Sequence, residues 1–230
     1  MGKKILSLLL AVAVMTSVFT TAIAISVSDS ETATSFADDW SKWSANHKSG
    51  YCGKANADEH GYNVMYSAGG SDKNSFTYAD TLDLGDKFDF GYKVTLSPAW
   101  GSQHKGLSYT VKIGELSVII AGNEAGSQLT LSAEYNGQTV ISSGKTLTPD
   151  TSSAVITAVE SAAKAASGAA EPQFMTQLYD VSLKFENGTL TLYYAGEVYG
   201  SCVLSSYSFS KVQLSVLPSF VNYNRAAVFD

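Results

Sequence analysis

The sequence predicts an all-β protein: an antiparallel β-sandwich of jelly-roll type with one short inserted helix. Many short stretches alternate apolar with polar residues, and turn signals separate them roughly every ten residues, as in sandwiches and barrels. Asn187-Gly188, the dipeptide most typical of a two-residue hairpin turn, stands between two such stretches. One Ala-rich stretch departs from the alternation and supplies the helix.

The clearest element is the hairpin around Asn187-Gly188. A type I′ turn there fixes the register over 181–194 and gives one apolar and one mostly polar face. The pairs expected on the apolar face are Val181 with Tyr194, Leu183 with Leu192, and Phe185 with Leu190. A three-residue loop at 195–197 is expected to place on that same face Val198, Gly200 and Cys202. The result is a three-stranded antiparallel meander with one buried side.

Further strands are expected where alternating or apolar runs are bounded by turn residues. They span 62–67, 74–81, 87–97, 107–113, 115–121, 127–135, 138–142 and 209–217. Residues 44–61 hold several Gly, Asn and Asp residues and are expected to form a loop. The Ala-rich stretch predicts a surface helix over 152–166, inserted between strands, because Ser and Thr open it and Gly168 follows it.

Residues 1–24 have the features of a secretory signal peptide: an initial pair of lysines, a short apolar run and the small-x-small end Ala22-Ile23-Ala24. We therefore expect a secreted, extracellular protein with no membrane segment after cleavage. A flexible leader is expected at 25–35 and one sandwich domain at 36–230. The last run of the sequence begins another strand and stops at Asp230.

The chain is acidic, with 15 Lys and Arg against 21 Asp and Glu and a formal charge of −6 at pH 7. Arg225 is the only arginine in the sequence. An acidic chain with a single arginine is a poor match for nucleic acid or for anionic lipid, because both are negatively charged.

The sequence holds two cysteines, Cys52 and Cys202. In an oxidising exterior an even pair favours a disulfide, which would stabilise the fold by closing a loop of about 150 residues. Cys202 is also expected on the buried face of the meander. The alternative is two separate buried thiols.

Four stretches share a pattern with a known group of jelly rolls: Phe36–Trp43, Leu82–Phe88, the hairpin Phe185–Tyr193 and the closing Ala227–Asp230. Over 36–230 the chain resembles the concanavalin A-like lectin/glucanase superfamily, including its laminin-G-like domains. The resemblance implies a jelly-roll sandwich that is truncated in its last strand, as in a fragment of a longer protein. This superfamily holds both enzymes and binding modules. Its laminarinase-type glucanases carry Glu-x-Asp-x-x-Glu on one strand, whereas no Glu here has Asp two positions on. This departure argues against that hydrolase activity, which needs a pair of carboxylates in one cleft.

Aromatic residues in loops are the best candidates for ligand contacts, because sugar rings pack their C–H faces on Trp and Tyr. Trp100 lies in a loop that contains Gly and Pro, with Gln103 and His104 nearby. Tyr51 and Tyr62 lie on either side of the first cysteine's loop and are expected to line the rim of the site. Capping of the core is the alternative role for Trp100.

Aspartates recur every third residue at Asp80, Asp83, Asp86 and Asp89. Calcium takes six to eight oxygen ligands, so a structural calcium ion near Asp83 or Asp86 is one expectation. The alternative is a set of solvated carboxylates, because a three-residue period scatters strand side chains over both faces. The three histidines lack the spacing of a zinc site.

Together these features predict a secreted, non-catalytic carbohydrate-binding or adhesion module whose partner is a glycan or cell-surface polysaccharide. No cofactor is expected beyond the structural calcium ion. The first alternative is a polysaccharide hydrolase or lyase on the same scaffold, which paired inward carboxylates or a Tyr/His/Lys cluster would indicate. The second is a structural domain whose sheet packs on another chain, which an exposed apolar patch would indicate.

Overall fold

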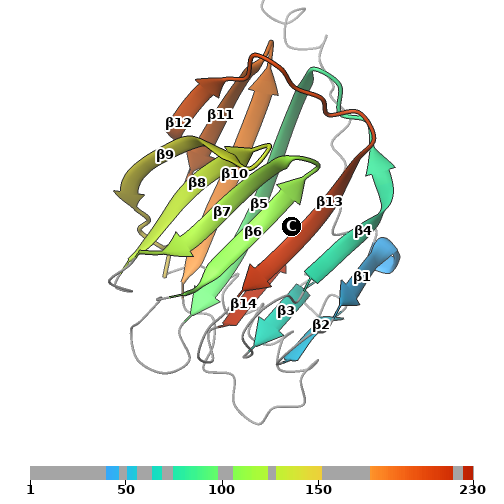
Figure 1. Cartoon of the computed structure of the whole chain (residues 1–230). Coiled ribbons are helices and arrows are strands. Elements are labelled where there is room, and N and C mark those ends of the chain that lie inside the picture. Colours follow the sequence, from blue (N-terminus) through green and yellow to red (C-terminus); the bar gives the residue numbers. More distant parts are fainter. Residues whose placement is uncertain are drawn as a thin grey trace, which may run out of the picture. The chain divides into compact units, whose positions relative to one another are not determined.

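The computed structural model describes residues 40–46, 51–55, 64–68, 75–97, 106–123, 128–151, 177–219 and 225–229. They belong to the compact unit Phe36–Asp230. Within these ranges the chain forms one short 3₁₀-helix, η1 (Trp40–Lys42), and fourteen strands in two antiparallel sheets of seven (Figure 1). The predicted antiparallel β-sandwich is confirmed. None of the described helical residues makes a helix that is long and apolar enough to cross a membrane.

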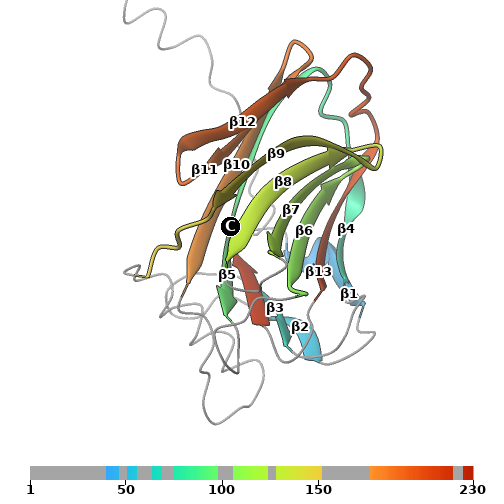
Figure 2. The same cartoon turned by 60° about the vertical axis from the view of Figure 1, so that its left-hand side comes forward.

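The two sheets are stacked layers, seen obliquely in Figure 2. The first sheet holds, in spatial order, β1 (Trp43–Asn46), β4 (Ser75–Leu82), β13 (Val212–Ser219), β6 (Ser108–Ile113), β7 (Leu116–Gly122), β8 (Leu129–Tyr135) and β9 (Gln138–Thr146). The second holds β12 (Glu197–Val203), β11 (Thr189–Tyr194), β10 (Leu178–Glu186), β5 (Lys87–Ser97), β14 (Arg225–Phe229), β3 (Val64–Ala68) and β2 (Tyr51–Ala55). The chain crosses repeatedly between the layers, so strands far apart in sequence become neighbours.

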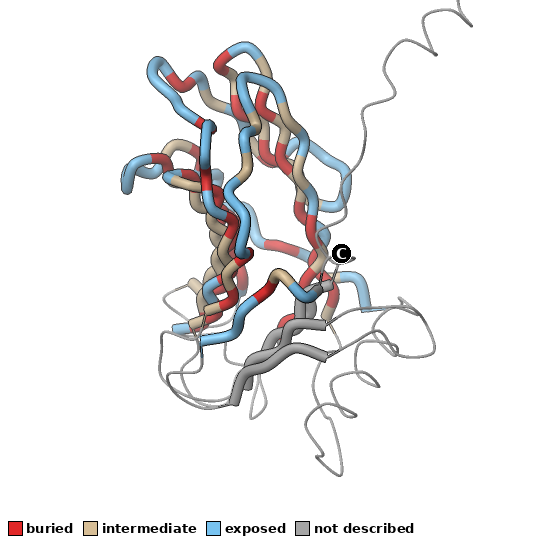
Figure 3. Tube along the Cα trace, turned by 90° about the vertical axis from the view of Figure 1, so that its right-hand side faces the viewer, coloured by how far each residue is buried: buried red, intermediate tan, exposed pale blue. Residues whose placement is uncertain are grey.

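The core lies between the layers, where the buried residues of both sheets gather (Figure 3). Strands β6, β7 and β8 alternate buried with half-buried residues, because one face of each strand is covered by the opposite sheet. Phe88, Phe185 and Phe209 form an aromatic cluster in this core, with ring centroids 4.8–5.6 Å apart. Edge-to-face and tilted contacts of this kind are the favoured geometry for aromatic rings.

The β10–β11 hairpin has the predicted register, with Leu183 opposite Leu192 and Phe185 opposite Leu190. Asn187 and Gly188 both have positive φ, 51° and 76°, as a type I′ turn requires. This confirms that the turn sequence and the alternation specify one pairing.

The third strand of the meander differs from the prediction. The turn has two residues, since Tyr194 pairs with Glu197, and a register shift follows between Leu192 and Tyr193. Val198 therefore lies opposite Tyr193 and is 57% exposed, whereas Tyr199 is 7% exposed. The expectation that Val198 faces the core is wrong, because the irregularity brings Tyr199 inward in its place.

Residues 44–61 are not wholly a loop. Strand β1 extends to Asn46 and pairs with β4, and β2 (Tyr51–Ala55) pairs with β3. Both are edge strands, where pairing with one neighbour is sufficient and the sequence does not need to alternate. Four predictions fall outside the described residues: the rest of the 44–61 loop, the signal peptide, the leader and the helix at 152–166.

The predicted disulfide between Cys52 and Cys202 is wrong. Cys202 is a half-buried free thiol on β12, and burial raises its pKa. Cys52 belongs to β2, and the two strands form the opposite edges of the same sheet. Six strand spacings separate them, on the order of 29 Å, whereas a disulfide needs Cα atoms within about 7 Å.

Candidate functional site

The structure leaves most of the predicted ligand residues untested. Trp100, Gln103, His104 and Tyr62 lie outside the described residues. The backbone of Tyr51 is in edge strand β2, paired with Ala68 of β3. A ligand role for these residues stays a prediction.

Asp83 and Asp86 lie exposed in the connection between β4 and β5. Asp80 is on β4, where its carboxylate is 2.7 Å from Lys42 Nζ, and Asp89 is on β5. The described part of the chain contains no group of three or more His, Cys, Asp or Glu arranged to hold a metal ion. A calcium ion at Asp83 or Asp86 therefore also stays a prediction.

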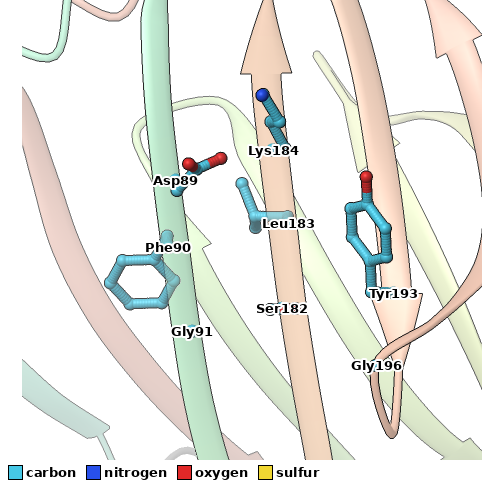
Figure 4. Close-up of a pocket in the computed structure, with 8 residues that line it drawn as sticks. All are labelled: Asp89, Phe90, Gly91, Ser182, Leu183, Lys184, Tyr193 and Gly196. Carbon is cyan, nitrogen blue, oxygen red and sulfur yellow. The ribbon is translucent and has the colours of Figure 1, made fainter. Parts of the chain in front are cut away.

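The candidate site is a hollow on the outer face of the second sheet, over β5, β10 and the β11–β12 hairpin (Figure 4). Its volume is about 420 Å³. The side chains and backbone that form it include Asp89, Gly91, Ser182, Lys184, Tyr193 and Gly196. The sheet ladder positions all of them, so the site is built on strands.

The floor of the hollow exists because two small residues meet there. Gly91 of β5 and Ser182 of β10 are directly paired. A Cβ atom built on Gly91 would lie 3.6 Å from Ser182 Cβ, which is ordinary contact. The sheet surface is therefore low at this pair, while larger side chains rise around it.

The walls come from neighbouring positions of the same ladder. Tyr193 of β11 pairs with Ser182, so its ring stands beside the floor. Asp89 and Lys184 pair with each other two residues along β5 and β10, so they lie at one end of the floor. An aromatic ring, a hydroxyl, a carboxylate and an ammonium group thus surround one hollow.

Lys184 is held in its charged form. Its Nζ is 3.1 Å from Glu186 Oε2, and this hydrogen bond raises its pKa, followed by the negative charges of Glu186 and Asp89. Desolvation and the positive charge of Lys87 act in the opposite direction with smaller effect. A lysine with a raised pKa is a poor general base at neutral pH. Among the described residues that line the hollow, Asp89 is the only one with a carboxylate, so these residues do not supply a retaining pair of carboxyl groups.

These contacts suit ligand binding better than acid–base chemistry. Tyr193, Gly91 and Ser182 are not among the site residues predicted from the sequence. One available signal was Gly91 in the interior of an otherwise alternating strand, because glycine there often marks a close approach to a ligand or backbone. The other was the polar face of the predicted hairpin, which carries Ser182 and Tyr193.

No protein-family model matches the sequence, and no curated protein sequence matches it. The solved structures to which the chain is similar include the following three. The CBM2 module of the evolved Dit protein of Lactobacillus casei BL23 phage J-1 has 13% identity and a TM-score of 0.47, covering 86% of each chain. An alginate lyase of polysaccharide lyase family 7 has 10% identity and a TM-score of 0.45, covering 86% of this chain and 96% of its own. A carbohydrate-binding module, CBM66, from Bacillus subtilis has 11% identity and a TM-score of 0.43, covering 82% and 92%.

Proposed function

We propose that this protein is a non-catalytic carbohydrate-binding module of the concanavalin A-like jelly-roll kind, and that it binds a glycan on the outer face of β5, β10 and β11. The observation that carries the proposal is the hollow over Gly91 and Ser182, with the ring of Tyr193 beside it. The predicted signal peptide at 1–24 supports an extracellular location, where cell-surface polysaccharides are available as partners.

The physical basis is the mixed character of a sugar ring. Its C–H face is apolar and packs on an aromatic ring such as that of Tyr193, and its hydroxyl groups both donate and accept hydrogen bonds. Ser182, Asp89 and Lys184 supply acceptors and donors within the same hollow. Because these side chains are carried by strands, the contacts are in place before the ligand arrives, which lowers the entropic cost of binding.

A glycan array followed by titration of the best ligand tests the proposal. We expect Tyr193→Ala to weaken binding at least about tenfold, since loss of an aromatic contact with its buried area costs on the order of 1.4 kcal/mol or more. Tyr193→Phe keeps the ring and is expected to retain most of the affinity.

Gly91→Ala is a second variant that fills the floor without a clash, because its new methyl group makes an ordinary contact with Ser182. It is expected to fold normally and bind more weakly. Trp100→Ala tests the loop site predicted from the sequence. If Tyr193→Ala keeps its affinity and Trp100→Ala loses it, the binding site lies in the Trp100 loop. If the wild type gives no signal with any glycan, the proposed function is refuted.

A further inference from the structure

Building on the glycan-binding function proposed above, we propose that the ligand is a neutral glycan, and that Glu186 acts as a specificity determinant that disfavours acidic polysaccharides. Glu186 does not line the hollow. It acts by engaging the lysines that an acidic sugar would need.

The outer face of β5 and β10 carries a ladder of compensated charges. Across these two strands Lys87 pairs with Glu186, Asp89 with Lys184, and Lys93 with Asp180. Each lysine therefore has a carboxylate as its cross-strand partner. The uncharged pair Gly91–Ser182 lies between the second and third of these pairs.

Glu186 engages two of these lysines at once. Its Oε2 is 3.1 Å from Lys184 Nζ, and its Oε1 is 3.9 Å from Lys87 Nζ. Both carboxylate oxygens thus face a cation beside the hollow. Cross-strand pairs of opposite charge stabilise a sheet modestly, so this arrangement is favourable without any ligand.

Binding of an acidic sugar beside these charges would be unfavourable. Proteins hold carboxylate and sulfate groups through charge-assisted hydrogen bonds from lysine or arginine. Here such a group would have to displace Glu186 from Lys184, and it would then lie close to the carboxylates of both Glu186 and Asp89. Like charges at an interface disfavour binding and so select against the wrong partner.

A neutral glycan meets no such penalty. Its hydroxyl groups can accept from Lys184 and donate to Asp89 while the ladder stays intact. The side chains of Lys87, Lys184 and Glu186 are each about two-fifths exposed, with 39–45% of their surface accessible. Solvent and salt therefore weaken the discrimination, and we expect a fold-change on the order of ten rather than complete exclusion.

The test is a titration of the full-length protein with neutral polymers (a soluble β-glucan, mannan and xylan) and acidic polymers (alginate and polygalacturonate) at low and high sodium chloride. We expect at least one neutral polymer to bind, with an affinity that salt changes less than about twofold. Alginate and polygalacturonate are expected to bind about tenfold more weakly or not at all.

Glu186→Gln removes the carboxylate and leaves the hollow in place. We expect this variant to bind the acidic polymers about three- to tenfold more tightly than the wild type, with a gain that salt abolishes, and to retain its neutral ligand. Glu115→Gln is the matched control, because it makes the same change of charge in the exposed turn between β6 and β7 of the first sheet.

The inference is overturned if the wild type binds alginate or polygalacturonate in a salt-sensitive way and as tightly as any neutral polymer. That result would still agree with the proposed glycan-binding function. An equal gain in Glu186→Gln and Glu115→Gln would overturn the role of Glu186. Failure of the wild type to bind any of the polymers would count against the proposed function itself.

Discussion

Two tyrosine hydroxyls in the core are buried at a cost to stability. Tyr92 of β5 and Tyr109 of β6 approach each other between the sheets, with ring centroids 6.3 Å apart. Neither hydroxyl has a hydrogen-bond partner among the described residues, and burial raises the pKa of both phenols. An unsatisfied buried polar group costs roughly 1–3 kcal/mol.

We therefore expect Tyr92→Phe and Tyr109→Phe to be neutral or stabilising, by up to about 1 kcal/mol each in urea unfolding. Tyr199→Phe is the control. The Tyr199 hydroxyl donates to the Lys145 carbonyl at 2.9 Å and accepts from the Leu131 N–H at 3.3 Å. Its loss should cost roughly 1–2 kcal/mol. Equal destabilisation by all three substitutions would contradict this account.

A third tyrosine predicts how stability depends on pH. Burial raises the pKa of Tyr194 to about 12, and the charges of Asp180 and Asp150 add to the shift. The folded state therefore holds this phenolic proton more tightly than the unfolded chain, whose tyrosine pKa is about 10. The resulting stabilisation is complete below pH 10 and is lost as the pH rises through 12.

Thermal melts between pH 8 and pH 12 check this expectation. The melting temperature should fall above about pH 10, and Tyr194→Phe should fall less steeply than the wild type. Parallel curves for the two proteins would show that Tyr194 does not contribute to the alkaline loss of stability.

At the scale of elements, β12 shows how an irregular strand is fitted against the opposite sheet. Gly200 of β12 lies under β9, and a Cβ atom on it would come within 2.7 Å of Ile141 Cγ2. Ile141 is buried and β-branched, so that methyl group cannot easily move aside. We expect Gly200→Ala to destabilise the protein by roughly 1–3 kcal/mol through overpacking.

The double variant Gly200→Ala/Ile141→Ala tests the cause of that loss in a double-mutant cycle. Because Ile141→Ala removes the clashing methyl group, the two substitutions together should cost clearly less than the sum of the single costs. Strict additivity of the free energies of unfolding would show that the clash with Ile141 is not the reason.

Within this meander the sequence predicts one strand register correctly and the next one incorrectly. Asn187-Gly188 specifies the β10–β11 register locally, because the turn geometry and the alternation agree. The β12 register depends on an irregularity opposite Leu192 and Tyr193 that no turn signal marks. At this irregularity Tyr199 is buried, and its hydroxyl is hydrogen-bonded to the backbone of β8 and β9 in the opposite sheet. Such a contact between distant elements is not visible in a local pattern.

At the scale of the whole molecule, most strands and the β10–β11 hairpin were predictable from the sequence, whereas the pairing of strands far apart in the chain was not. The predicted 87–97 strand has the bounds of β5, yet its neighbours are β10 and β14, both far along the chain. The hollow depends on this pairing, because Gly91 and Ser182 become neighbours only when β5 meets β10. The sequence shows a glycine inside one strand and a polar face on another. That the two are adjacent follows only from the pairing of β5 with β10.

The proposed glycan-binding surface is the outer face of β5, β10 and β11. Its most direct test is a titration of isotope-labelled protein with the best-binding neutral polysaccharide, followed by the shifts of backbone amide signals in two-dimensional NMR spectra. We expect the largest shift changes at Gly91, Ser182 and Tyr193 and at the residues paired with or next to them in the sheet. Changes concentrated in residues 98–105 around Trp100, or on the first sheet, would contradict it.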